Sequence, residues 1–219
     1  MLSHQESKRF YDWFGSKQDW QRFYEDPAVS NMLTHAAFES AEAVFEFGCG
    51  TGRLARRLLE ELLPPSATYQ GIDVSETMVS LAQRALAPFG ERAQVQLSSG
   101  EVYLEIDDAS MDRFLSTYVL DLLSEEDILA LLEEASRILV PGGLLCLTGL
   151  TKGATPLAAV IERAWVGLHH VRPQWLGGCR PISLPRFLED RELSIEHHTQ
   201  ITSLALTSEV VIARKVEFP

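Results

Sequence analysis

The segment Ala43-Val-Phe-Glu-Phe-Gly-Cys-Gly-Thr-Gly52 decides the fold of this chain. Its first five residues are apolar except for Glu46, as expected of a central parallel strand that is covered on both faces. Gly48, Gly50 and Gly52 then permit a tight turn and close approach of a ligand, because glycine has no Cβ. A helix that begins after this turn directs its free N–H groups toward the same place. The segment therefore predicts a strand, a turn and a helix that bind a nucleotide-type cofactor.

The spacing of the glycines argues against a dinucleotide. A dinucleotide-binding turn has the pattern G-x-G-x-x-G/A, which places its third small residue at Arg53 in this chain. An arginine there would obstruct both the packing of helix on strand and the approach of a pyrophosphate. The chain has instead E-x-G-x-G-x-G from Glu46 to Gly52, which resembles the first motif of the class I S-adenosylmethionine-dependent methyltransferases. An ordinary strand-to-helix loop is the alternative, and the later segments distinguish the two.

This resemblance implies S-adenosylmethionine as cofactor and S-adenosylhomocysteine as product. In the family the acidic residue of the motif lies by the methionine end and helps to hold its ammonium group, which implies that role for Glu46. The turn residues Gly48, Cys49, Gly50 and Gly52 would line the cofactor. We expect Cys49 to pack rather than to react.

A second acidic residue follows the next predicted strand, which ends at Asp73. It lies about 20 residues after the glycine turn, where a βαβ unit places a carboxylate beside the ribose of a nucleotide. Each carboxylate oxygen would accept a hydrogen bond from one ribose hydroxyl. A helix-capping role is the alternative for Asp73, but Ser75 is better placed to cap the helix predicted at Glu76–Leu86. Val74 and Met78 would then supply apolar walls for the adenine.

Two further stretches resemble family motifs at the cofactor site. Ser99-Gly100-Glu101 stands where the family often has Gly-Asp, with the acid accepting from the adenine amino group. Glu101 is one methylene longer than aspartate, so a solvated surface acid is the alternative; Val102 follows it in the site. Ser116 would lie at the end of the strand that begins near Met111. The Ser-Thr-Tyr-Val that begins at Ser116 lacks the Asn/Asp-Pro-Pro-Tyr of enzymes that methylate exocyclic amines of bases.

The order of patterns predicts a doubly wound, Rossmann-like α/β domain. The resemblance implies seven strands in the order 3-2-1-4-5-7-6, with helices on both faces of the sheet. Leu193–Thr202 and Leu206–Lys215 alternate as a terminal antiparallel hairpin. The turn at Val140-Pro-Gly-Gly143, part of a stretch that resembles R-x-L-x-P-G-G, is expected between a helix and a buried strand at Leu144–Leu150.

The regions outside these motifs predict a cap and a lid. Residues 1–42 are rich in aromatic residues at helical spacing, which predicts a helical cap with a break at Asp26-Pro27 and a helix from about Ala28 to Ser40. Residues 43–219 would form the cofactor-binding domain, with residues 151–182 as an insertion over the substrate. A capped short helix is predicted from Ser183.

The catalytic residues are not identified by any motif. Tyr11 in the cap and His169 and His170 in the insertion are candidates for a general base or a substrate contact. The alternatives are core packing for the aromatic residues and partly exposed histidines at a helix end.

The composition bounds the acceptor and the compartment. A net charge of −12 argues against a nucleic-acid surface, which needs clustered Lys and Arg, and favours a small neutral or cationic acceptor. Three cysteines without metal-ligand spacing predict neither a disulfide scaffold nor a metal site. With no signal-peptide pattern and no apolar run as long as a membrane span, we expect a cytoplasmic protein. The oligomeric state is open between a monomer and a homodimer.

The predicted reaction is methyl transfer to a small-molecule acceptor by in-line displacement. One alternative is a domain that binds S-adenosylmethionine or S-adenosylhomocysteine without transfer, as a sensor or regulatory subunit. Another is a protein or RNA methyltransferase. A NAD-dependent oxidoreductase is the remaining rival within the fold, and Arg53 and the terminal hairpin oppose it.

Overall fold

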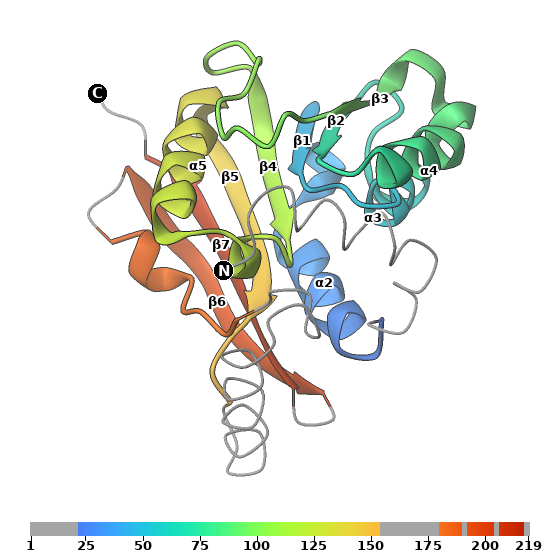
Figure 1. Ribbon diagram of the computed structural model, residues 1–219. Helices are drawn as coiled ribbons and strands as arrows, with labels where there is room; N and C mark the ends of the chain where they lie inside the picture. Colours follow the sequence, from blue (N-terminus) through green and yellow to red (C-terminus); the bar gives the residue numbers. More distant parts are fainter. Residues whose placement is uncertain (1–21, 154–179, 190–191, 204–205, 217–219) are drawn as a thin grey trace.

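The computed structural model describes residues 22–153, 180–189, 192–203 and 206–216. Seven strands form one mixed sheet in the order β3-β2-β1-β4-β5-β7-β6, which confirms the predicted order (Figure 1). β1 to β5 are parallel, and β7 lies antiparallel between β5 and β6. The strands are β1 Ala43–Phe47, β2 Thr68–Asp73, β3 Ala93–Leu97, β4 Met111–Thr117, β5 Leu139–Leu150, β6 Leu193–Ser203 and β7 Leu206–Lys215.

Helices and single turns connect the strands. Ser75 caps the predicted helix by accepting from the Met78 N–H, and Ser124 caps the helix after β4 in the same way. The longer elements are α2 Arg22–His35, α3 Arg53–Arg57, the π-helical turn η3 Leu58–Leu62, α4 Glu76–Leu86, η4 Ala87–Arg92 and α5 Glu125–Ile138. Three 3₁₀ turns complete the described chain: η2 Phe38–Ser40, η5 Leu120–Leu122 and η7 Pro185–Phe187.

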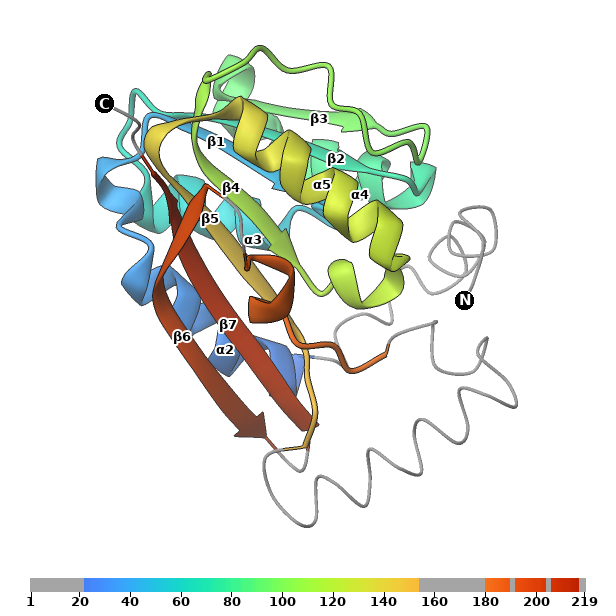
Figure 2. The ribbon, with the colours of Figure 1, turned by 90° about the vertical axis from the view of Figure 1, so that its left-hand side faces the viewer.

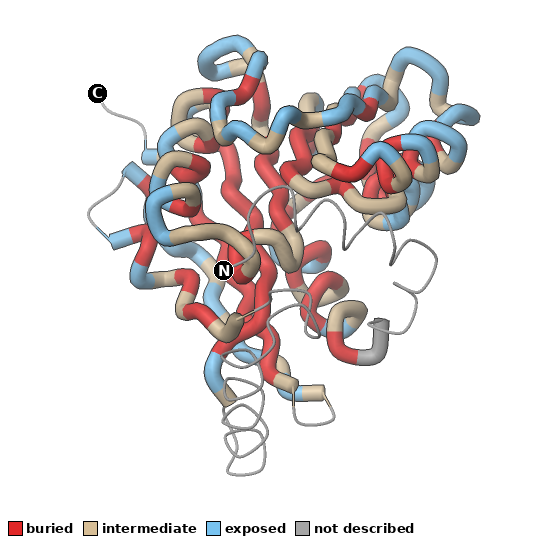
Figure 3. The backbone as a smooth tube through the Cα atoms, viewed as in Figure 1, coloured by how far each residue is buried: buried red, intermediate tan, exposed pale blue. Residues whose placement is uncertain are grey.

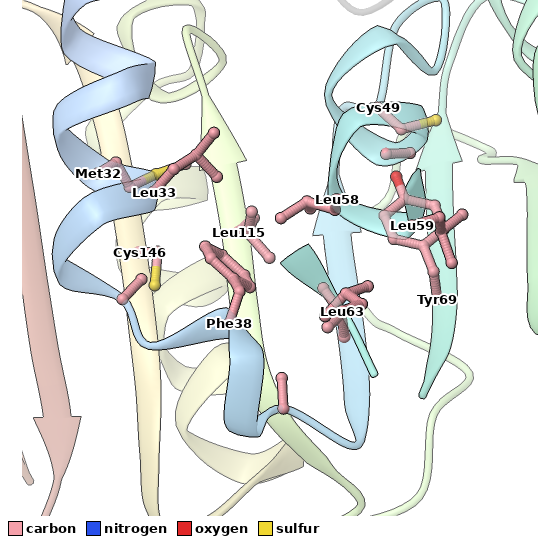
Figure 4. Close-up of a cluster of buried hydrophobic side chains, with 14 of the residues drawn as sticks. Met32, Leu33, Phe38, Cys49, Leu58, Leu59, Leu63, Tyr69, Leu115 and Cys146 are labelled. Carbon is pink, nitrogen blue, oxygen red and sulfur yellow. The ribbon is translucent and has the colours of Figure 1, made fainter. Parts of the chain in front are cut away.

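The sheet is covered on both faces, so most residues of its central strands β1 and β4 are buried. α5 and η7 lie in front of it in Figure 2, with α2 and α3 behind, and Figure 3 shows the buried strands between these layers. On the α5 face, Phe45 and Phe114 pack with ring centroids 5.5 Å apart. Figure 4 shows part of the opposite cluster, in which Met32 of α2 and Leu58 and Tyr69 take part. This cover on both faces explains why β1 is almost wholly apolar.

The expected break at Asp26-Pro27 is wrong, because α2 continues through Pro27. Proline removes one backbone hydrogen bond from a helix, a cost that falls here near the start of α2. Ala28, Val29 and Met32 bury their side chains against the sheet and hold the helix together across this position. Residues 28–41 thus share one hydrophobic core with the sheet, while the predicted division at residue 42 remains a prediction.

Two further local expectations are corrected. The turn expected at Val140–Gly143 lies inside β5, because Leu139 already pairs with Met111 of β4. The four residues bulge outward, since the next pair is Leu144 with Arg113, and Gly142 takes a φ of 78° there. The helix predicted from Ser183 is the single turn η7. Within the described residues, no helix combines the length and apolarity needed to cross a membrane.

Candidate functional site

Backbone hydrogen bonds connect the glycine turn to the end of β2. The N–H groups of Gly48 and Cys49 both donate to the Ile72 carbonyl, at 2.9 and 3.0 Å. Gly48, Gly50 and Gly52 have φ angles of 81°, 53° and 75°, a region that favours glycine. A Cβ at position 48 would lie 2.3 Å from a Val119 methyl group, so this residue must also be small. The turn therefore requires glycine for its conformation and for its contact with the segment after β4.

Asp73 joins this turn to α4. Its Oδ2 accepts from the Gly50 N–H and its Oδ1 accepts from the Ser75 N–H, both at 2.9 Å. These two backbone N–H groups hold the carboxylate at the carboxyl end of β2 in a fixed orientation.

Glu46 lies beneath the turn and is 1% exposed. The Tyr69 hydroxyl donates to its Oε2 at 2.5 Å. Burial raises the pKa of Glu46 to about 7, the Tyr69 hydrogen bond opposes this, and the neighbouring Asp73 charge adds to it. Burial and the same two carboxylates also raise the pKa of the Cys49 thiol, which keeps it unreactive. Cys49 is thus a packing residue, as expected.

Of the other predicted cofactor residues, some are buried or partly buried and one is exposed to solvent. Met78 is buried in the first turn of α4, and Val74 is half-buried beside it. Glu101 is exposed, whereas Val102 packs against the α5 cluster. Gly100, between β3 and β4, has a φ of 91° and donates to a neighbouring serine hydroxyl.

Ser116 is fully buried, and its hydroxyl links two neighbouring strands. Its hydroxyl donates to the Phe47 carbonyl at 3.1 Å, across the boundary between β4 and β1. The two parallel strands meet at this point on either side of the position where the strand order reverses. Ligands of doubly wound sheets bind in the crevice at such a switch point. We call the glycine turn with Asp73 the cofactor half of this crevice.

A second group of side chains lies where the start of α2, the start of α3 and the segment after β4 meet. We call Tyr24, Glu25, Arg53, Tyr118 and Asp121 the acceptor half. The Tyr24 and Tyr118 rings meet edge to face at 5.6 Å, and Glu25 lies 3.9 Å from the Arg53 guanidinium. Asp121 is fully buried, and its charge acts on both Glu25 and Tyr118. The acceptor half joins the start of α2 to the start of α3 and to the end of β4.

Glu25 has an altered acidity. Burial raises its pKa to about 7, and the charges of Asp26 and Asp121 raise it further against the lowering effect of Arg53. A carboxylate with such a pKa can exchange a proton near neutrality. Hydrophobic periodicity did not reveal Glu25, because its altered acidity depends on burial and on charges from other segments.

The candidate catalytic residues Tyr11, His169 and His170 lie outside the described residues. A second histidine pair, His197 and His198, lies on β6 at the sheet edge. His197 contacts the Asn31 side chain at 2.7 Å and stacks on His35 at 3.8 Å between ring centroids. These contacts join α2 to β6.

Comparisons with known proteins agree with this geometry. Residues 44–143 match a family model described as a methyltransferase domain. The fold is similar to that in a solved complex between the Haloferax volcanii Trm112 methyltransferase activator and a methyltransferase, with a TM-score of 0.74 and 16% identity. That match covers 97% of this chain and 98% of the solved one. At this identity the likeness shows the fold alone.

Sequence relatives differ in what they act on. The carboxy-S-adenosyl-L-methionine synthase of Actinobacillus succinogenes is 31% identical, over 56% of this chain and 53% of the relative. The malonyl-[acyl-carrier protein] O-methyltransferase of Hahella chejuensis is 34% identical, over 57% and 41%. A tRNA N(3)-methylcytidine methyltransferase of Schizosaccharomyces pombe is 26% identical, over 63% and 48%. The chain thus spans about half the length of these relatives or less. The strand order, the glycine turn and the family match over residues 44–143 identify a class I S-adenosylmethionine-dependent methyltransferase domain in this chain, whose cofactor is S-adenosylmethionine.

Proposed function

We propose that this chain transfers the methyl group of S-adenosylmethionine to a small-molecule acceptor. The observation that carries the proposal is the position of Asp73, whose two oxygens are held by the Gly50 and Ser75 N–H groups beside the glycine turn. A carboxylate at the carboxyl end of the second strand, with one oxygen for each of two neighbouring hydroxyls, suits an adenosyl ribose. The division of the chain into a cap, a cofactor domain and a lid is part of the same proposal.

The residues of the cofactor half would bind and orient. Asp73 would hold the ribose, and the glycine turn would let the main chain approach the methionine moiety without a Cβ in the way. Val74 and Met78 would flank the adenine, with Gly100, Glu101 and Val102 at its far edge. When bound, the cofactor supplies an activated methyl group on a sulfonium and its own leaving group. The protein's contribution is then mainly alignment of the acceptor and exclusion of water.

The acceptor half would receive the nucleophile. An oxygen nucleophile needs a base, and Glu25, with a pKa near 7 and next to Arg53 at the start of α3, is suited to that role. Tyr118 contributes an aromatic wall, because its ring packs on Tyr24 and its hydroxyl is engaged with Ser208 at 2.7 Å. The net charge of −12 supports a neutral or cationic small molecule over tRNA, although one relative is a tRNA methyltransferase.

Two measurements on the same preparation test the proposal. Calorimetry with S-adenosylmethionine and S-adenosylhomocysteine should give saturable heats, and absence of heat with both on folded protein would overturn it. Formation of S-adenosylhomocysteine should then be followed with small amines, phenols and carboxylates and, separately, with tRNA. Turnover with tRNA and with none of the small molecules would show that the acceptor is a nucleic acid and not a small molecule. Binding without turnover across the whole panel would favour a sensor or regulatory domain.

A further inference from the structure

Glu46 belongs to the motif that predicted the turn, but its buried hydrogen-bond partner Tyr69 does not. In the register of β1 and β2, Glu46 pairs with Gly71, and Tyr69 lies two residues earlier on the same face. A Cβ at position 71 would lie 2.6 Å from the Tyr69 hydroxyl and 3.0 Å from the Cys49 Cβ. The missing side chain of Gly71 therefore opens the space through which the hydroxyl reaches the carboxylate. Figure 4 shows the Tyr69 hydroxyl directed toward Cys49 of the turn.

The hydroxyl acts as a donor in this contact. Burial and the Glu46 charge raise the pKa of Tyr69 well above its usual value, so the phenol keeps its proton. Its bond to Oε2, at 2.5 Å, stabilises the ionised form of Glu46 and restricts the side chain to one orientation. The ring is itself completely buried in the cluster that α2, α3 and α4 form with the sheet. Tyr69 therefore has little freedom to release the carboxylate.

The groups around Glu46 are acidic or neutral. Asp73 and Tyr69 face it from β2, and Cys49 faces it from the turn. A cation brought to this place would favour the ionised carboxylate, whereas the protein surroundings disfavour it. The cofactor carries such a charge on its ammonium group in both the donor and the product form.

We propose that Tyr69 is a positioning residue: its hydroxyl holds Glu46 beneath the glycine turn, and cofactor binding there releases one proton from Glu46 to solvent. This inference rests on the proposed function, because it requires the cofactor to bind in the cofactor half. It extends that function to a residue outside the motif and to a pH dependence of cofactor affinity. The sign follows from the chemistry: protons compete with the cofactor's cation for Glu46, so affinity rises with pH until Glu46 is ionised in the free protein.

The test is calorimetry with S-adenosylhomocysteine between pH 5.5 and 8, where the amino group of a free amino acid stays protonated. For the wild type we expect affinity to increase by up to about tenfold per pH unit in the lower part of this range. Titrations at pH 6.5 in two buffers with different ionisation enthalpies should report release of more than about half a proton. Glu46→Gln removes the titrating group and should bind with a flat profile and no such release.

Tyr69→Phe keeps the ring and removes only the donor. We expect its affinity profile to move to higher pH, with binding about fivefold or more weaker at pH 6 and close to wild type at pH 8. An equal loss at all pH values would indicate a merely structural role and overturn the proposal. Wild-type binding without proton release would overturn it as well, even if a variant failed to fold. Absence of any wild-type binding would instead refute the proposed function.

Discussion

The two halves of the crevice are built in different ways. In the cofactor half the geometry comes from the backbone: three glycines with positive φ and two N–H groups that orient Asp73. In the acceptor half it comes from side chains on three separate segments, such as the Glu25–Arg53 and Tyr24–Tyr118 contacts. A backbone-built site depends on conformations that few residues adopt, whereas a side-chain-built site can change one residue at a time. We therefore expect substitutions in the cofactor half to abolish binding and those in the acceptor half to alter turnover.

The largest effect is expected for Gly50→Val. Its φ of 53° is strained for a β-branched residue, and the new side chain would occupy space next to Asp73, to which Gly50 donates. Affinity for S-adenosylhomocysteine should fall by more than 100-fold in calorimetry, while circular dichroism shows a folded protein. Gly90→Val is the matched control, since Gly90 also has a positive φ, 57°, but no atom lies near its missing Cβ. It should lose about 1–3 kcal/mol of stability and bind normally.

Asp73→Ala should have the next largest effect. Loss of hydrogen bonds to a charged group costs about 1.5–3 kcal/mol, which corresponds to roughly 10- to 150-fold weaker binding. Asp73→Asn should lie between this variant and the wild type, because it keeps one acceptor oxygen. The measurement is the dissociation constant for S-adenosylhomocysteine at pH 7.5. Unchanged affinity in Asp73→Ala would remove this residue from the site.

Glu25→Gln separates the two halves most directly. With an acceptor from the panel that reacts through oxygen, kcat should fall by about 100-fold, while the affinity for S-adenosylhomocysteine changes by less than twofold. The wild-type rate should rise through about pH 7 as Glu25 ionises, and the variant should lose this step. Because the pKa is raised in the folded state, the stabilisation from Glu25 is present at low pH and is lost as pH rises through 7. The exposed Glu125→Gln serves as control, and a wild-type kcat in Glu25→Gln would exclude it as the base.

The smallest effect is expected for Arg53→Gln. Arg53 pairs with Asp26 at 2.6 Å, and both side chains are nearly half exposed. Such pairs contribute less than about 1 kcal/mol, so the urea midpoint should barely move. Arg56→Gln is the control, because it removes an exposed ion pair with Glu60 one helical turn away. Its urea midpoint should equal that of Arg53→Gln. A much larger loss in Arg53→Gln alone would show that α2 and α3 depend on this link.

The parts of the fold that local patterns govern were predictable. α4 and its Ser75 cap and the bounds of β1 and β7 agree with the structure, because periodicity and turn residues act over a few neighbours. The strand order also agrees, but it came from the family resemblance and not from local patterns. Local patterns did not predict that α2 continues through Pro27. There the burial of side chains against the sheet offsets the helix-breaking effect of proline.

In the site, too, some features were predictable from the sequence and others depend on tertiary packing. The proximity of Asp73 to the glycine turn followed from the length of a βαβ unit. The partner of Glu46 did not follow, although the cost of burying a carboxylate required one. Tyr69 is 23 positions away, and only the register of β1 and β2 with the gap at Gly71 brings its hydroxyl to the carboxylate. The acceptor half likewise depends on tertiary packing.

The place of β7 between β5 and β6 has a consequence for handling the protein. β6 joins the sheet through β7, and β7 in turn covers the backbone of Leu144–Leu150. Proteolysis that removed Leu206–Lys215 would expose a long apolar strand edge from the centre of the sheet. Such edges recruit strands from other molecules, so nicked material would precipitate rather than persist as a shortened monomer.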